Sequence, residues 1–179
     1  MIVYEPAVEL KLPRAARPRR RELARFLRQA IEATGLAGDV SVLLTGDEAI
    51  RTLNRNFRRK DKATDVLSFP AVEGTEGVAG DLAISLETAF RQAREHQHTL
   101  EMETKILLLH GLLHLAGYDH ETDNGTMHRK EVRLRRELGL TAALIERAQR
   151  GHAQQDRAQR DRAKRGRAQG RASREAVRA

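Results

Sequence analysis

Two histidines four residues apart, His110 and His114, lie in an almost wholly apolar segment and constrain the chain more than any other feature. On a helix, residues with this spacing share one face, so both imidazoles can bind the same metal ion. The flanking leucines predict that this helix is buried. Gly117 can adopt the left-handed conformation that ends a helix. The turn would bring His120 toward the other two, which predicts a three-histidine metal site.

Three histidine ligands with an open fourth position are typical of catalytic zinc sites, since structural sites usually have four protein ligands and often contain cysteine. The chain has no cysteine. The spacing resembles the metzincin pattern H-x-x-x-H-x-x-G-x-x-H, but Gly111 replaces the glutamate that is the general base of H-E-x-x-H proteases. A zincin-like metallohydrolase of peptides or small molecules is therefore an alternative, with peptide hydrolysis the less favoured chemistry.

Nearby carboxylates have a different predicted role. Asp81 and Asp119 could orient a metal-binding histidine through a hydrogen bond. Together with Glu121 they are also the candidates for a general base, which the sequence does not identify. The remaining histidines have no ligand spacing and are interpreted as ordinary surface residues: His96, His98, His128 and His152.

The positive charge is concentrated in the C-terminal part of the chain. Residues 141–179 contain 11 basic and four acidic side chains, whereas residues 1–140 contain 22 and 21. We therefore expect one domain over residues 1–140 and a basic tail over 141–179, helical at its start and then disordered because it lacks an apolar stripe. The tail could bind nucleic acid electrostatically or be a dispensable extension.

Neither end of the sequence suggests a membrane protein. No stretch approaches the roughly 20 apolar residues of a membrane span. The N-terminal residues Met1–Glu5 lack the basic and apolar regions of a signal peptide. We expect a cytoplasmic protein without membrane association.

Hydrophobic periodicity predicts an α+β domain with four strands and about five helices, one of them the zincin-like metal helix. A capping box of Thr45 and Glu48 would begin the second helix, and Asp123 or Asn124 would cap the last. The predicted strands are residues 1–4, 40–44, 66–69 and 82–85. The predicted helices are residues 19–34, a segment after Thr45 ending near Phe57, 86–96, 100–115, and a last helix ending at Leu138.

A basic loop follows the second helix and contains Arg58, Arg59, Lys60 and Lys62. These side chains could reach the metal only if the strand 66–69 lies beside the metal helix. An arginine placed there would bind a phosphate through two hydrogen bonds and stabilise the negative charge of a transition state. From the residues alone, a solvated turn is the slightly favoured interpretation.

Three motifs taken together resemble the YbeY family of bacterial ribosomal RNA maturation endoribonucleases: residues 57–70, 80–82 and 110–120. The resemblance runs from about Val40 to Leu140. It implies a mixed four-stranded sheet, one zinc ion bound by His110, His114 and His120, and Arg58 as a catalytic residue lining the cleft. Ala63 departs from the family, where a proline is frequent, and the tail lies outside the resemblance.

The resemblance also implies a function. It predicts a single-strand-specific, zinc-dependent endoribonuclease acting in 16S rRNA 3′-end maturation and ribosome quality control. Ribosomal RNA and the small ribosomal subunit are the expected partners, with ribosomal proteins or a ribosome-assembly GTPase as further candidates. Water activated by zinc would attack a phosphodiester whose charge is offset by zinc and Arg58, while Arg59, Lys60 and Lys62 bind substrate. A non-catalytic RNA-binding assembly factor is a further alternative.

Overall fold

The structure is a computed structural model that describes residues 1–72, 74–119 and 123–140. Residues Met1–Leu140 belong to one compact unit. His120, Glu121 and the basic tail lie outside the described residues, so the predictions made for them stay predictions.

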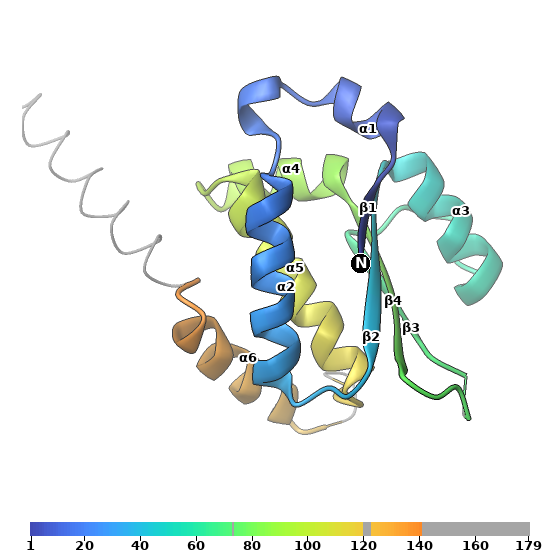
Figure 1. Cartoon of the computed structure of the whole chain (residues 1–179). Helices are drawn as coiled ribbons and strands as arrows, with labels where there is room; N and C mark the ends of the chain where they lie inside the picture. The colour runs from blue at the N-terminus through green and yellow to red at the C-terminus, as the bar shows by residue number, and fades with distance from the viewer. Residues whose placement is uncertain (73, 120–122, 141–179) are drawn as a thin grey trace, which may run out of the picture. The chain divides into compact units, whose positions relative to one another are not determined.

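A four-stranded sheet forms the centre of the domain, with the strand order β1-β2-β4-β3 (Figure 1). The first three strands in this order are parallel, and β3 runs antiparallel to β4 at the sheet edge. This arrangement confirms the predicted mixed sheet. The strands are β1 (Ile2–Tyr4), β2 (Asp39–Thr45), β3 (Val66–Pro70) and β4 (Val78–Ser85).

Six α-helices surround the sheet within the described residues, one more than the sequence predicted. They are α1 (Pro6–Lys11), α2 (Arg20–Thr34), α3 (Asp47–Arg58), α4 (Leu86–Glu95), α5 (Leu100–Leu115) and α6 (Thr126–Glu137). The missed helix is α1, whose six residues are too few to show a helical period, although Pro6 favours a helix start. No described helix combines the length and apolarity needed to cross a bilayer.

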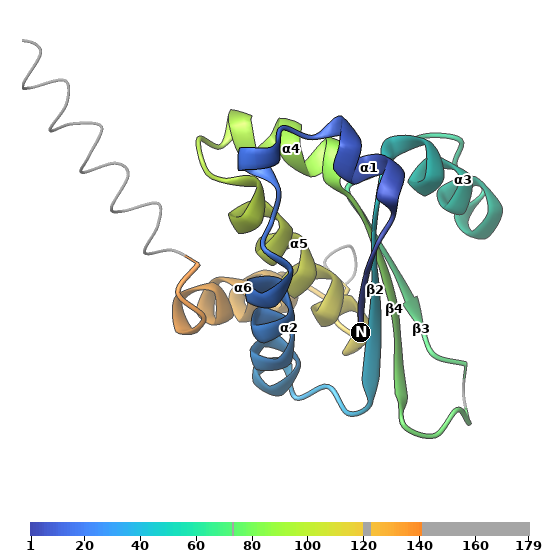
Figure 2. The same cartoon turned by 45° about the horizontal axis from the view of Figure 1, so that its top comes forward.

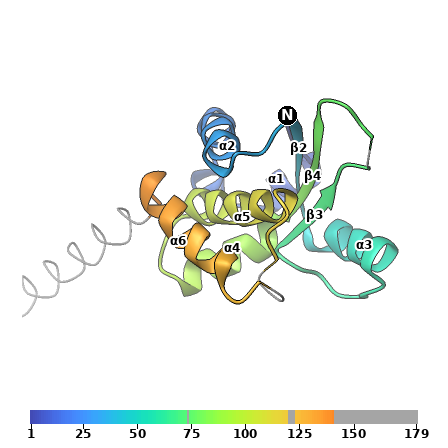
Figure 3. The same ribbon diagram turned by 90° about the horizontal axis from the view of Figure 1, so that it is seen from below.

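The helices cover the two faces of the sheet unequally, as Figures 1, 2 and 3 show. Strand alternation turns Leu82 and Ile84 toward α2 and α5, where they join the main core. Ala83 points to the other face and packs with Ile50 of α3 and Leu67 of β3 in a much smaller cluster. Thus α5 and α3 lie on opposite faces of the sheet.

The helix α5 is buried, as predicted. Its four central leucines are fully inaccessible: Leu108, Leu109, Leu112 and Leu113. The Thr99 hydroxyl caps its start by accepting a hydrogen bond from the Met102 amide at 3.2 Å. Gly117 has a φ of 85°, and the following Tyr118 amide returns to the Leu113 carbonyl at 3.1 Å, which confirms the predicted helix end.

Both predicted helix caps differ from those in the structure. The Thr45–Glu48 capping box is wrong, because α3 starts at Asp47 after the N-cap Gly46 and the Thr45 hydroxyl instead donates to the Glu5 carboxylate. Neither Asp123 nor Asn124 is the N-cap of the last helix, because α6 starts at Thr126 after the N-cap Gly125, but Asp123 still accepts hydrogen bonds at this helix start. The Asp123 carboxylate accepts from the Gly125 amide at 3.1 Å and from the Met127 amide at 2.7 Å.

Candidate metal centre

His110 and His114 lie on one face of α5 with their Nε2 atoms 3.2 Å apart. The ring centroids are 4.8 Å apart and the rings are nearly perpendicular, at 78°. The structure therefore brings these two predicted ligands together. Because α5 is packed on nearly all sides by the core, the backbone that carries both rings is held rigidly.

Glu131 of α6 orients the first of these rings. Its Oε2 lies 3.3 Å from His110 Nδ1, and because a carboxylate can only accept, Nδ1 must carry the proton. The Nε2 lone pair is then directed toward His114. Arg135 holds the other carboxylate oxygen of Glu131 at 2.6 Å. Burial opposes ionisation of Glu131, but the hydrogen bond from His110 and the charge of Arg135 outweigh it and lower the Glu131 pKa.

This pair fits a metal ion. Two nitrogens bound to one tetrahedral zinc ion at about 2.0–2.1 Å would lie about 3.3–3.4 Å apart. The observed separation of 3.2 Å between the two Nε2 atoms is close to that value. A carboxylate that fixes the histidine tautomer from behind is the usual neighbour of a metal-binding imidazole. Sequence reasoning missed Glu131, because its 21-residue separation from His110 has no periodic signal.

The third predicted ligand, His120, lies outside the described residues. Asp119 is described and stands in the turn that follows Gly117. Its backbone carbonyl accepts from the Asp123 amide at 3.0 Å, which ties this turn to the start of α6. The turn therefore leads from the end of α5 to the helix that carries Glu131.

Gly111 stands where a zincin protease has the glutamate that acts as general base. The structure packs this residue against the sheet, so that a Cβ would lie 2.8 Å from Leu82 Cδ2 and 3.3 Å from Ser68 Oγ. Both are closer than an ordinary contact with a side chain allows. The position faces the core rather than open space, and a glutamate there could not serve as a base without disrupting the packing.

Asp81 is not brought to these histidines by the fold. It precedes Leu82, which faces α5 and meets Gly111, so strand alternation turns Asp81 to the opposite face of the sheet. There it lines a cavity with Phe57 and Phe69. Its predicted role as a hydrogen-bond partner of a metal-binding histidine has no support in this placement.

The basic loop is a fixed structure rather than a loose turn. Asn54, 2% exposed, donates from its side-chain Nδ2 to the Lys62 carbonyl at 2.8 Å, and its main-chain carbonyl accepts from the Lys60 amide at 3.3 Å. Asp61 accepts two hydrogen bonds of 2.8 Å from Arg51. These hydrogen bonds are the main reason why the Asp61 pKa lies below its usual value.

Holding the loop in this way leaves its other basic side chains exposed: Arg58, Arg59, Lys60 and Lys62. Over the ranges that the structure describes, none of these four forms an ion pair with a carboxylate. Four exposed cations without acidic partners are suited to binding a polyanion.

The condition under which this loop could approach the metal helix is met. Strand β3, which the loop enters, lies against α5, and the Ser68 hydroxyl donates to the Gly111 carbonyl at 3.2 Å. The basic loop and the metal helix are thus joined through one edge strand.

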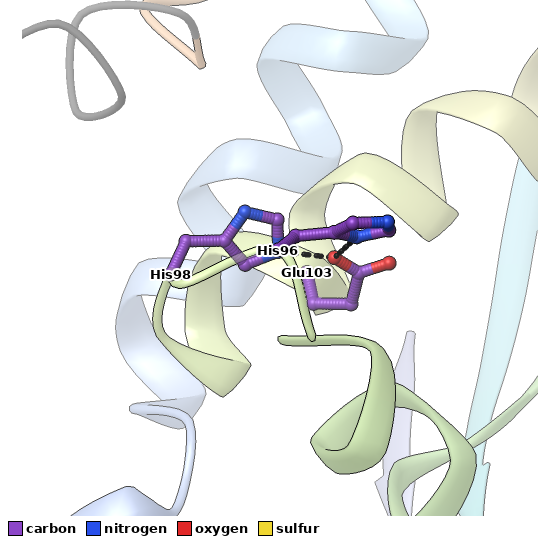
Figure 4. A group of neighbouring side chains, drawn as sticks. All are labelled: His96, His98 and Glu103. Carbon is purple, nitrogen blue, oxygen red and sulfur yellow. Dashed lines mark hydrogen bonds and ion pairs between the residues drawn. The ribbon is translucent and has the colours of Figure 1, made fainter. Parts of the chain in front are cut away.

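A second group of potential metal ligands lies near the start of α5, formed by His96, His98 and Glu103 (Figure 4). Their ligand atoms lie within 4.8 Å of one another, so this group could hold a metal ion. In Figure 4 both rings approach the same Glu103 carboxylate, with His96 Nδ1 at 3.6 Å and His98 Nε2 in direct contact.

The interpretation of His98 as a surface residue is wrong. Its side chain is only 4% exposed and pairs with Glu103, which is 5% exposed, whereas His96 is 60% exposed. The sequence offered one signal for this contact, because Glu103 stands in the first turn of the predicted metal helix and His98 directly precedes the N-cap Thr99.

Comparisons with known proteins show the family of this chain. Residues 11–139 match the protein family described as Endoribonuclease YbeY. The chain belongs to the YbeY family. The Endoribonuclease YbeY of Koribacter versatilis is 54% identical over 125 residues, which cover 70% of this chain and 81% of that protein. The protein of the same name from Solibacter usitatus is 53% identical over 131 residues, covering 73% and 87%.

A solved structure has a similar fold. The solution structure of TM1509 from Thermotoga maritima is 30% identical to this chain and has a TM-score of 0.51, with 77% of this chain and 89% of that chain covered. The family match includes α5 with both described histidines and α3 with Arg58. It ends at residue 139, so it does not extend into the basic tail.

Proposed function

We propose that this YbeY-family endoribonuclease hydrolyses phosphodiester bonds of single-stranded RNA with a zinc ion held by His110, His114 and His120. The observation that carries the proposal is the opposed pair of Nε2 atoms, 3.2 Å apart on a buried helix and oriented by Glu131. When bound, zinc supplies Lewis acidity that activates water and polarises a phosphoryl oxygen. The group of His96, His98 and Glu103 could also hold a metal ion, and a His96→Ala variant tests it separately.

The chain's own residues would prepare the site in three ways. Glu131 holds His110 in the tautomer whose Nε2 lone pair is available to a ligand. Arg58, at the end of α3, would bind the scissile phosphate and offset the charge that develops in the transition state. Arg59, Lys60 and Lys62 would bind neighbouring phosphates of the strand. Asp119 and Glu121 are the candidates for the general base.

The biological role follows from the family resemblance. We propose that the substrate is ribosomal RNA, with 16S rRNA 3′-end maturation and ribosome quality control as the processes served. The small ribosomal subunit would be the principal partner, and ribosomal proteins or a ribosome-assembly GTPase could deliver the enzyme to it. The cations of the basic loop are exposed and have no carboxylate partner among the described residues, which supports a polyanionic partner.

Peptide hydrolysis is a weaker candidate. A glutamate at the position of Gly111 is what a zincin protease needs, and even a Cβ at this position would displace the Leu82 side chain. A non-catalytic assembly factor would bind the same RNA through the same loop, so only a cleavage assay separates it from the enzyme.

The test is to incubate the metal-loaded full-length chain with a small-subunit precursor RNA and map the ends produced. A His114→Ala variant and a chelator-treated sample are compared in parallel. Cleavage by the intact protein alone is the expected result. Equal behaviour of all three samples, with RNA binding retained, would instead support the assembly factor.

A further inference from the structure

A cavity of about 310 Å³ lies on the face of the sheet that α3 covers only in part. Its lining includes Ala83, which points away from α5, and also Leu82, whose side chain belongs to the main core, so the cavity opens on the α3 side of β4. The proposed hydrolysis makes no use of this cavity. Its lining includes aliphatic, aromatic and acidic side chains from three strands and from α3: Leu43, Leu53, Phe57, Phe69, Asp81 and Ala83.

The aromatic part of this lining is unusually exposed. Phe57 is 67% exposed although it is among the largest apolar side chains of the chain. It contacts Phe69 of β3 edge to face, with ring centroids 5.1 Å apart and an interplanar angle of 70°. An edge-to-face pair leaves the face of at least one ring open, and that face can stack on a flat group.

The charge around this cavity indicates which flat group would bind there. Phe57 is directly followed by Arg58 and Arg59 at the C-terminal end of α3, and both are exposed. A second cavity, of about 490 Å³ between α1 and α3, has Glu5, Lys11 and Glu48 in its lining but no aromatic side chain. Of these two cavities in the described part of the chain, the Phe57 cavity is the one that combines an open aromatic ring with neighbouring cations.

We propose that the Phe57 cavity binds one unstacked nucleobase of an RNA strand while the adjacent basic loop binds the flanking phosphates. Stacking on aromatic side chains beside a basic groove is how proteins hold single strands with little sequence preference. The inference rests on the proposed function, which it deepens by assigning the group that recognises unpaired RNA. A base paired within a duplex is not free to enter such a cavity.

Asp81 would complete this base site. Its carboxylate can only accept hydrogen bonds. Every RNA base carries at least one N–H group on its pairing edge, so Asp81 would orient the stacked base without selecting one base among the four. Asp81 would then act in the cavity that it lines and not as a partner of a metal-binding histidine.

The experiment measures RNA binding rather than cleavage. It uses fluorescence anisotropy with the full-length chain, at a fixed salt concentration and with a chelator present to prevent cleavage. The probes are a labelled single-stranded RNA octamer and the same ribose–phosphate chain without bases. The basic tail can bind both probes, so the quantity compared is the difference between them. Phe57→Ala should weaken binding of the octamer by about tenfold, the size of one lost base stack, and leave the abasic probe unchanged.

Three further variants make the result specific. Phe57→Trp should retain binding of the octamer, and Phe57→Leu, which keeps an apolar side chain against Phe69, should lose it. Val3→Ala is the matched control, because Val3 is 44% exposed and lies on β1 at the other edge of the sheet. Thermal unfolding of each variant checks that the fold is intact.

The outcomes separate this inference from the proposed function. Wild-type affinity in Phe57→Ala, or equal losses for both probes, overturns the base site. If the Lys60→Ala/Lys62→Ala double variant weakens both probes while Phe57→Ala has no effect, the loop still binds RNA and only the base site is wrong. If the wild-type chain binds neither probe, the base site and RNA binding by the basic loop both fail.

Discussion

The two faces of the sheet differ in how completely helices cover them. On one face, α2 and α5 bury a continuous core, and His110 and His114 project from its most buried helix. On the other, α3 covers a cluster of only three buried side chains and leaves the Phe57 cavity open. This difference suggests that the two faces have different roles. The well-packed face holds the metal-binding side chains in place, and the sparsely covered face exposes side chains that bind substrate.

The largest expected effect is on RNA cleavage and comes from removing a side chain that binds substrate. Arg58→Ala should lower RNA cleavage by about 10²- to 10³-fold, since one strong donor to the transition state is lost. The metal content, measured by mass spectrometry of the purified chain, should not change. Arg28→Ala, another exposed arginine, on α2, is the control and should cleave normally. Loss of metal in Arg58→Ala would contradict the assignment of metal binding and substrate binding to different faces of the sheet.

The packing difference itself can be measured. Leu108→Ala removes a side chain with 0% exposure on α5 and should destabilise the fold by about 3 kcal/mol. Leu53→Ala on the half-buried side of α3 should cost about 1 kcal/mol, because less apolar area is lost. Urea denaturation at neutral pH compares the two variants. Equal losses would contradict the unequal packing of the faces.

The orientation of His110 is a finer feature of the packed face. Glu131→Gln should weaken metal binding by about 10- to 100-fold, because an amide no longer fixes the imidazole tautomer as a carboxylate does. A competitive titration with a chromophoric chelator measures this affinity. Glu137→Gln, on the same helix and 54% exposed, is the control. If Glu131→Gln binds metal like the wild type, Glu131 is only a structural contact.

The smallest expected effect is at the start of α5, where Glu101 accepts from Arg19 Nε at 3.1 Å and from Lys105 at 3.0 Å. Burial opposes its ionisation, but these hydrogen bonds lower the Glu101 pKa to about 2. Because the folded pKa lies below the usual value of 4.5, the stabilisation is complete above that pH and is lost as the pH falls toward 2.

Glu101→Gln should therefore cost about 1 kcal/mol at pH 7, after allowance for solvent screening, and progressively less in acid. Urea denaturation at pH 7 and pH 3 gives both values. A cost that stays constant between these pH values would show that the carboxylate charge is not what stabilises the helix start.

The packed face was the easier to predict. The continuous apolar run around His110 and His114 can only be a buried helix, and Gly117 marks its end, so α5 followed from local sequence. The Thr45–Glu48 cap failed because a tertiary partner, Glu5, takes the Thr45 hydroxyl. A local motif cannot show such competition from a residue 40 positions away.

The sparsely covered face, and the contacts of Glu131 and His98, were harder to predict from the sequence. Asp81 was assigned by its proximity to a motif, but the two-residue period of a strand turned it to the other face. Glu131 and the burial of His98 depend on how α6 and the α4–α5 turn pack on α5, which no spacing in the sequence encodes. The basic loop was found, while the Asn54 contacts that fix it were not.

The most direct test is to measure bound zinc per chain in the full-length protein and its variants after saturation and removal of free metal. We expect one zinc ion in the wild type, none in His110→Ala/His114→Ala, and one in His96→Ala, which removes the exposed donor of the other group of ligands. Zinc retained in the double variant but lost in His96→Ala would place the metal beside Glu103 and contradict the account.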